Sequence, residues 1–245
     1  MSLRDRLADR TGQLFNDETR ATILLLREEK GWSVGKIAKF LKLDADTVGR
    51  YFQLLEEKDY PDPEPITTFV WDLETTSLKS DIGTLLMGSF LDLATGEVVT
   101  ARLSSDQSMN IADAERQLAE EVIALYSSAS ILIGHYSTVF DRNFMNGIAA
   151  RIGLPAPPKR FHIDTCMVAR YGLKGLYQSN SLDNLADVLR VGVKDRPSKA
   201  DWREASIRDE DALERIRLRC ESDVRLTAAV WSKLLPYWVE WKGSR

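Results

Sequence analysis

The chain has few cysteines and no long apolar run. Its 245 residues include two cysteines, Cys166 and Cys220, whose separation does not match the spacing of metal-binding cysteines. Two thiols suit a reducing compartment, so we expect a cytoplasmic protein. No stretch approaches the roughly 18 apolar residues that span a membrane. The charged segment at residues 1–6 lacks the apolar core of a secretory signal. A membrane partner is therefore not expected.

The chain also lacks an excess of positive charge. Its net charge is −4, and its 44% hydrophobic and 29% charged residues are the composition of an ordinary globular protein. These values argue against a protein coated in basic surface. They are compatible with a nucleic-acid partner, because an acidic nuclease site needs only a local basic rim.

Internal repeats and low-complexity tracts are absent, but the pattern changes near residue 60. Residues 58–65 alternate proline with acidic residues, which is typical of a stiff, extended linker. This segment predicts an N-terminal domain at residues 1–58, a linker at 59–65 and a larger domain at 66–245.

The N-terminal segment has three helical patterns, at residues 19–30, at 34–41 and from Asp46 onward. Within it, the apolar positions Ile37, Ala38, Leu41 and Val48 have the spacing of two helices that cross at a tight turn, so the segment resembles a helix-turn-helix. The glycine usual in that turn is replaced by Lys42.

As a nucleic-acid binder, this module would place the helix from Asp46 in a major groove. The residues expected to contact nucleic acid are Lys36, Lys39, Lys42, Thr47, Arg50 and Gln53. Because the charges of residues 1–58 nearly cancel, the alternative of a trihelical module for protein contact or packing stays open.

After residue 65 the pattern mixes strands and helices. The expected strands are 66–71, 85–93, 98–103, 131–134 and 161–164, and the expected helices are 111–125, 140–152, 182–189 and 209–235, with another beginning at Thr165. This order predicts an α/β fold with a mixed sheet flanked by helices.

Two acids, Asp72 and Glu74, follow the first expected strand. Side chains at positions i and i+2 of a strand point the same way, so these carboxylates share one face. They repel each other unless a positive charge lies between them, and Mg²⁺ or Mn²⁺ prefers such oxygen ligands. The alternative is a solvated acidic turn.

Two further acids follow in later elements. Asp141 stands in the first turn of an expected helix, where a capping role is the alternative to a functional one. Asp223 lies at the edge of an apolar stripe formed by Cys220, Val224 and Thr227. A carboxylate on a buried side needs a partner, because burying an unpaired charge is costly.

These residues resemble the motifs of a known superfamily. Residues 72–78, Asp-Leu-Glu-Thr-Thr-Ser-Leu, closely resemble the first motif of the DnaQ-like (DEDD) 3′–5′ exonucleases; residues 134–141 are similar to the second motif and Asp223 to the third. The resemblance covers residues 66–240 and is nearest to the proofreading domains of family B polymerases and the YprB-type predicted exonucleases. It implies a ribonuclease H-like fold.

The resemblance also implies the chemistry. Two ions, Mg²⁺ or Mn²⁺, about 3.5–4 Å apart would support hydrolysis of DNA or RNA from a single-stranded 3′ end. Asp72 would bridge both ions, Glu74 and Asp223 would hold the ion that activates water, and Asp141 would complete the second site. The implied contacts of the terminal nucleotide are Leu73, Thr75, Thr76 and Leu78. Ordinary turn and core packing is the alternative for these four residues.

One position departs from the family pattern. The Tyr or His that usually precedes the last acid is replaced by Arg219 or Leu218, and an arginine stays protonated. Arg219 either binds the scissile phosphate, pairs with Asp223 in competition with metal, or is a solvated helix residue. Tyr136 stands where the second motif often has Asn.

For other polar residues, an ordinary structural role is at least as good an interpretation as a functional one. We expect His135 to be a packed core residue and Asp164 to cap the helix from Thr165. The side-chain types that can replace the missing base are found at His162, Tyr171 and Tyr177. A basic rim or a merely solvated loop is expected at Lys194, Arg196 and Lys199.

The sequence therefore predicts a metal-dependent 3′–5′ exonuclease. The missing Tyr or His keeps a second hypothesis open, a non-catalytic or weakly active nucleic-acid-binding regulatory protein with an exonuclease-like fold. Endonucleolytic cutting by the same metal centre is a third.

Overall fold

The computed structural model describes residue 15 and residues 17–28, 30–56, 67–175, 177–194 and 198–243. The described residues fall into two compact units, one from the first 66 residues together with Lys242 and Gly243, and one at Thr67–Trp241. The proline-rich segment 59–65 lies outside the described residues, so the linker stays a prediction. Across the described part of the chain, no helix combines the length and apolar character needed to cross a membrane.

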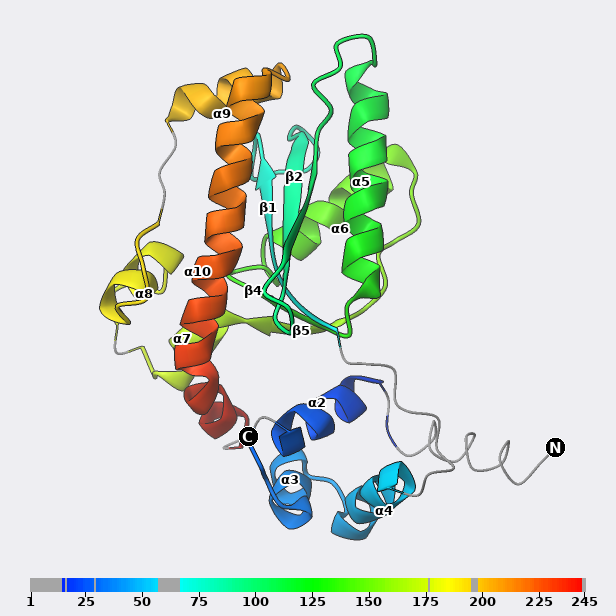
Figure 1. Ribbon diagram of the computed structural model, residues 1–245, viewed down its shortest axis with the longest axis vertical. Helices are drawn as coiled ribbons and strands as arrows, with labels where there is room; N and C mark the ends of the chain where they lie inside the picture. The colour runs from blue at the N-terminus through cyan, green and yellow to red at the C-terminus, as the bar shows by residue number, and fades with distance from the viewer. Residues whose placement is uncertain are drawn as a thin grey trace, which may run out of the picture. The chain divides into compact units, whose positions relative to one another are not determined.

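The N-terminal unit contains the helices α2 (Asp17–Glu28), α3 (Val34–Leu41) and α4 (Ala45–Glu56) (Figure 1). Its buried side chains include Ile23, Leu26 and Ile37. The Ser33 hydroxyl caps α3 by accepting a hydrogen bond from the Lys36 N–H. Lys42 ends α3 in the left-handed conformation, with φ 54°, and so fills the place of the expected glycine. The three helices lie where the sequence predicts them.

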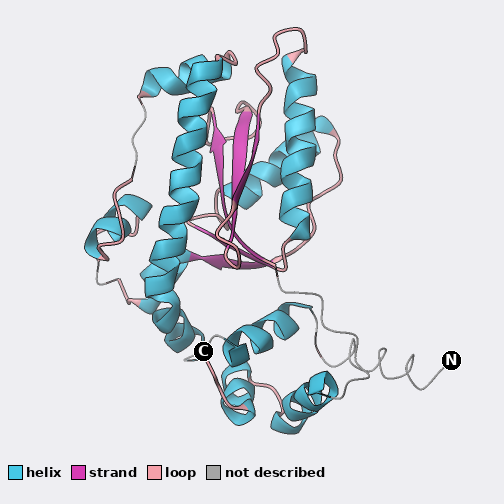
Figure 2. Ribbon diagram, in the orientation of Figure 1, coloured by secondary structure: helices cyan, strands magenta, loops and turns pink. Residues whose placement is uncertain are grey.

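The larger unit is built on a five-stranded sheet with the order β3-β2-β1-β4-β5. The strands are β1 (Thr68–Thr75), β2 (Leu85–Asp92), β3 (Val98–Arg102), β4 (Ile131–Gly134) and β5 (Phe161–Asp164). β1 pairs antiparallel with β2 and parallel with β4, while β2–β3 is antiparallel and β4–β5 is parallel. Figure 2 shows helices around this sheet. The predicted α/β fold with a mixed sheet flanked by helices is confirmed.

Helices pack on both sides of β1. The helices of this unit are α5 (Ile111–Ser128), α6 (Asp141–Ile152), α7 (Thr165–Gly172), α8 (Leu182–Val188), α9 (Lys199–Ser206) and α10 (Glu210–Gly243). A side chain at Gly88 of β2 would meet both Leu73 and Val122, which places Leu73 on the face covered by α5. The opposite face carries Asp72, which the Cys220 thiol of α10 approaches. The alternation of β1 therefore places Leu73 and Asp72 on opposite faces of the sheet.

Two helices differ from the predictions. α9 was not predicted, and it begins at Lys199, a residue expected to lie in a loop, because Ser198 and Asp201 form a reciprocal capping box. α10 was expected to end at residue 235 but continues through Pro236, with Trp238 buried beyond it. Tertiary packing of that last segment outweighs the hydrogen bond that the proline removes.

Candidate functional site

β1 is longer than predicted, and the two leading acids lie inside it. Asp72 pairs with Ser89 and Glu74 with Met87 of β2. The loop beyond is closed by Thr76, whose N–H donates to the Thr84 carbonyl at 3.0 Å and whose hydroxyl accepts from the Thr84 N–H at 2.9 Å. The prediction that the strand ends before Asp72 is therefore wrong. The pairing of β1 with β2 holds both acids on strand backbone, and its register shifts directly after Glu74.

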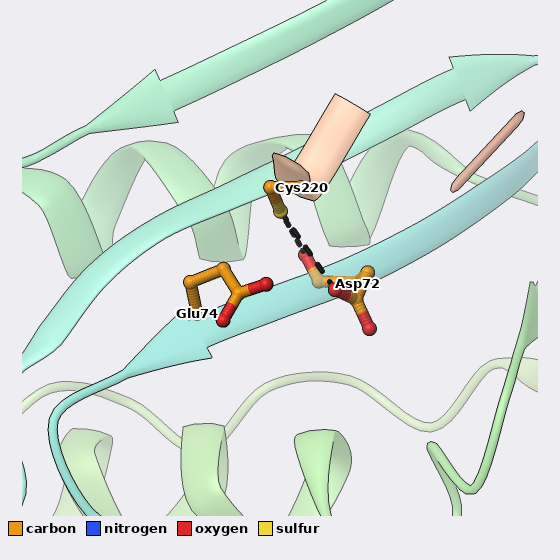
Figure 3. A group of neighbouring side chains, drawn as sticks. All are labelled: Asp72, Glu74 and Cys220. Carbon is orange, nitrogen blue, oxygen red and sulfur yellow. Dashed lines mark hydrogen bonds between the residues drawn. The ribbon is translucent and has the colours of Figure 1, made fainter. Parts of the chain in front are cut away.

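A thiol joins the two acids. Among the described residues, Asp72, Glu74 and Cys220 form a group whose ligand atoms all lie within 4.8 Å of one another (Figure 3). The Cys220 Sγ lies 3.6 Å from the backbone carbonyl of Asp72 and 3.8 Å from its Oδ2. Sequence reasoning identified a buried cysteine but not this contact. The available signal was the three-residue separation of Cys220 from Asp223, which places both on one side of a helix.

Asp223 is buried on α10 and is held by two cations. Its Oδ2 lies 2.8 Å from the Lys194 Nζ and 3.4 Å from the Arg219 Nη2. Its Oδ1 is buried and has no hydrogen-bond partner within the described ranges. A buried polar atom normally has a partner, and a bound cation would supply one here. Lys194 was predicted only as part of a basic rim, and its pairing with Asp223 was missed.

Arg219 spans two acids. Its Nη1 pairs with the Glu74 Oε1 on β1, while its Nη2 faces Asp223 one helical turn further along α10. The guanidinium also lies over the Trp202 ring of α9, with its carbon 5.0 Å from the ring centroid. The side chain is only 16% exposed, so Arg219 is not the solvated helix residue that was one alternative. Trp202 was not foreseen, because α9 itself was missed.

Asp141 connects a helix to the middle of β1. It is the first residue of α6 and is buried, and its Oδ1 accepts a hydrogen bond from the Leu73 N–H at 3.0 Å. The residue at the N-cap of α6 is Phe140, so the carboxylate of Asp141 is engaged with β1 instead of serving as that cap. β4 pairs with β1 only as far as Val70. The Leu73 N–H lies beyond this pairing, and Asp141 satisfies it.

The acids raise one another's pKa values. Burial, followed by the charge of Asp223, raises the pKa of Asp72 to about 7, against the opposing effect of Lys194 and Arg219. Burial and then the Asp72 charge raise the pKa of Asp141 well above its usual range. Burial and the same Asp72 charge hold the pKa of the Cys220 thiol well above its usual range. Such crowding is relieved when a cation binds among the acids.

A fifth acid, Asp164, has a different task. It caps α7 through the N–H groups of Cys166 and Met167, at 3.0 and 3.2 Å, as expected. The same carboxylate accepts from the Tyr136 N–H at 2.9 Å and from the Thr138 N–H and hydroxyl at 3.1 and 2.6 Å. Asp164 thus fixes the loop that leads into α6 and the residue Asp141. Five donors saturate it, which leaves no oxygen for a metal.

The two histidines are structural. Burial lowers the pKa of both His135 and His162 to about 4. The His135 Nδ1 lies 2.9 Å from the Thr165 hydroxyl, and the His162 Nε2 accepts from the Trp71 indole at 3.0 Å. His135 is a packed residue as expected. His162, considered as a replacement base, is engaged by Trp71.

The residues expected to contact a nucleotide separate into two kinds. Leu73 is buried in the core, so its side chain is not presented to a base. The Thr75 hydroxyl donates to the Ser77 carbonyl at 2.8 Å, and Thr76 closes the same loop. Leu78 is 80% exposed. Of the two leucines, Leu78 is the one whose side chain is open to solvent.

The polar residues of the N-terminal unit are mostly open to solvent. Exposed side chains are found at Lys36, Lys39, Lys42, Arg50 and Gln53. Thr47 is half-buried, and its N–H and hydroxyl both donate to the Asp44 Oδ1 at 2.8 Å. Asp44 thus caps α4 and holds Thr47 in the first turn of that helix, so Thr47 does not face a groove freely. Arg196 of the predicted basic rim lies outside the described residues.

Comparison with known proteins addresses the fold. No family model matches the chain, and no curated protein matches it. Among solved structures it is similar to the family B DNA polymerase from the hyperthermophilic archaeon Pyrobaculum calidifontis, with a TM-score of 0.50 and 16% identity. The larger unit has a ribonuclease H-like fold. The match covers 72% of this chain and 25% of the polymerase chain, so this chain spans about a quarter of that protein's length.

At this identity the likeness concerns the fold alone. It agrees with the predicted resemblance to family B polymerases at that level. The donor set itself fits a hard divalent ion, because carboxylate oxygens predominate and the Asp223 Oδ1 is buried without a partner among the described residues. Asp72 and Glu74 belong, with Cys220, to the group that could hold such an ion, while Asp141 and Asp223 stay predicted ligands.

Proposed function

We propose that this chain is a metal-dependent 3′–5′ exonuclease that hydrolyses phosphodiester bonds of DNA or RNA. The observation that supports this most directly is the assembly of four acids from three elements, β1, α6 and α10. Asp72 and Glu74 share a face of β1, Asp141 bonds to the backbone between them, and the charge of Asp223 acts on Asp72. Acids are seldom buried together without a cation to bind.

The proposed cofactor is Mg²⁺ or Mn²⁺, bound by these four carboxylates, with two ions implied by the family resemblance. Such an ion would supply a charge that activates water and stabilises the leaving 3′ oxygen. The acids are carried by the rigid elements β1, α6 and α10, which keeps their geometry fixed before substrate arrives.

Other residues would position the substrate. Arg219 is held by Glu74 and Trp202, so its guanidinium is fixed beside the acids and suited to a phosphate oxygen. Exposed Leu78 would pack on the base at a single-stranded 3′ end. Because arginine remains protonated, Arg219 contributes charge and orientation but does not remove a proton.

An assay with end-labelled single strands tests this proposal. With Mn²⁺ present, the wild-type chain should shorten 5′-labelled DNA or RNA stepwise from the 3′ end. Asp72→Ala and Asp223→Ala should abolish shortening while the circular dichroism spectrum stays native. Asp211→Ala, an exposed acid on the same helix as Asp223, is the matched control. Full activity of Asp72→Ala would overturn the proposal, and cleavage of a circular strand would point to an endonuclease.

The position of Arg219 favours a second candidate, a non-catalytic or weakly active nucleic-acid-binding regulatory protein. Arg219 replaces the usual base and lies between Glu74 and Asp223. In this case the chain would bind the labelled strand without shortening it at any Mn²⁺ concentration. Nucleic-acid binding by the N-terminal helices and the cytoplasmic location stay predictions.

A further inference from the structure

The acids around Asp72 are already partly neutralised by the chain's own cations. Arg219 contacts Glu74 with one nitrogen and faces Asp223 with another, while Lys194 contacts the same Asp223 oxygen at 2.8 Å. In the proposed function Glu74 and Asp223 would share one of the two ions. The guanidinium of Arg219 therefore spans the same two ligands that this ion would bridge.

The charges fit one ion better than two. The four acids carry four negative charges when ionised, and Arg219 and Lys194 neutralise two of them. The two that remain match a single divalent ion. A second ion would give the site an excess of positive charge in a partly buried environment, where unbalanced charge is costly.

Arg219 is also held firmly in this position. Its side chain is 16% exposed, its guanidinium lies over the Trp202 ring, and it cannot lose its proton. Lys194 is 21% exposed and sits at hydrogen-bond distance from its partner. Displacing Arg219 would break its partly buried ion pair with Glu74 and its contact with the Trp202 ring. The binding free energy of an incoming ion has to offset the loss of both contacts.

We infer that the site binds one divalent ion rather than two, with the guanidinium of Arg219 and the ammonium of Lys194 in place of the ion that Glu74 and Asp223 would otherwise share. This inference rests on the proposed function, since it concerns the same acids. The ion that remains would be held by Asp72 together with Asp141. Water on the Glu74 side would then be activated without a second ion, which predicts slow chemistry.

Titration of the full chain with Mn²⁺ alone, without nucleic acid, tests the inference. Isothermal calorimetry should give one ion per wild-type chain, and the electron paramagnetic resonance spectrum should show an isolated ion. Arg219→Gln should bind two ions and show spin coupling between them. Arg217→Gln is the matched control, because Arg217 lies two residues earlier on α10 but pairs with Glu214 and Glu221 instead. It should keep one ion.

A second variant guards against misfolding of Arg219→Gln. Lys194→Gln should bind its ion about tenfold more tightly or better, because a positive charge beside a ligand is removed. Two ions in the wild type, one ion in folded Arg219→Gln, or unchanged affinity in Lys194→Gln would overturn the inference. If the wild type binds two ions and shortens the strand, the one-ion inference is overturned but the proposed function stands. If the wild type binds one ion and does not shorten the strand, the proposed nuclease function is overturned instead. If it binds no ion, both are overturned.

Discussion

The Asp141 carboxylate on α6 accepts a hydrogen bond at 3.0 Å from the backbone N–H of Leu73, the residue between Asp72 and Glu74 on β1. This bond fixes the third acid relative to the first two through the backbone. It also satisfies an amide that lies beyond the pairing of β1 with β4. One carboxylate thus serves both the fold and the proposed ion site.

Two substitutions of Asp141 should separate these tasks. Asp141→Ala leaves the Leu73 N–H buried without an acceptor, so the free energy of unfolding should fall by about 1–3 kcal/mol. Asp141→Asn keeps an acceptor oxygen and should unfold near the wild-type urea midpoint. Both variants remove a proposed ligand and should lower nuclease activity by roughly 100-fold or more. If the alanine variant is as stable as the asparagine variant, the hydrogen bond between Asp141 and Leu73 does not stabilise the fold.

Much of the sheet was readable from the sequence because its parallel strands are short apolar runs between turns. β4 and β5 begin and end at their predicted residues, 131–134 and 161–164. β1 extends beyond its apolar run because its last residues gain cross-strand partners on β2. Because Asp72 and Glu74 are polar, the hydrophobic pattern does not reveal that they pair with β2. The sequence therefore places these acids after the strand instead of inside it.

The cations of the site were less readable for a different reason. Lys194 lies after α8 and meets Asp223 of α10, and Trp202 meets Arg219 only because α9 exists. Both contacts depend on tertiary packing between segments that no local pattern connects. The sequence leaves open whether the Arg219 side chain pairs with Asp223 or faces solvent. Helical spacing places the two residues side by side but does not distinguish these two cases.

His162 should make stability depend on pH. Its Nε2 accepts a hydrogen bond from the Trp71 indole, and burial lowers its pKa from 6.5 to about 4. Between pH 6.5 and pH 4, His162 binds a proton in the unfolded chain but stays neutral in the folded chain. The contribution of His162 to stability is therefore lost as pH falls from about 6.5 to about 4. The loss should approach about 3 kcal/mol at the lower end.

Urea unfolding of wild type and His162→Gln across pH 4–7 measures this effect. Glutamine can still accept from the Trp71 indole but does not titrate, so the wild type should lose stability relative to His162→Gln as pH falls across this window. His135 and the acids with raised pKa values titrate in both proteins, so their effects cancel in this difference. Identical slopes for the two proteins would mean that His162 does not contribute.

Exposed cations on α3 and α4 allow a test of the predicted nucleic-acid contacts. Lys39→Glu and Arg50→Glu change side chains that are open to solvent. Each should weaken binding of duplex DNA with little loss of stability, and each should reduce the slope of log affinity against log salt by about one. Fluorescence anisotropy at several salt concentrations gives both quantities. Lys159→Glu, an exposed lysine of the larger unit, is the control, and equal slopes for all three would favour the protein-contact alternative.

Leu78 should bind substrate without supporting the fold. Its side chain is 80% exposed in the loop after β1, so Leu78→Ala should leave the unfolding midpoint unchanged. Covering a leucine with a base is worth about 1.5–3 kcal/mol, so the KM for a single-stranded 3′ end should rise about tenfold or more while kcat changes little. Ile82→Ala is the matched control, because Ile82 is 74% exposed in the same loop. A comparable rise in KM for Ile82→Ala would show that the loop contributes general apolar surface and that Leu78 has no specific contact with the base.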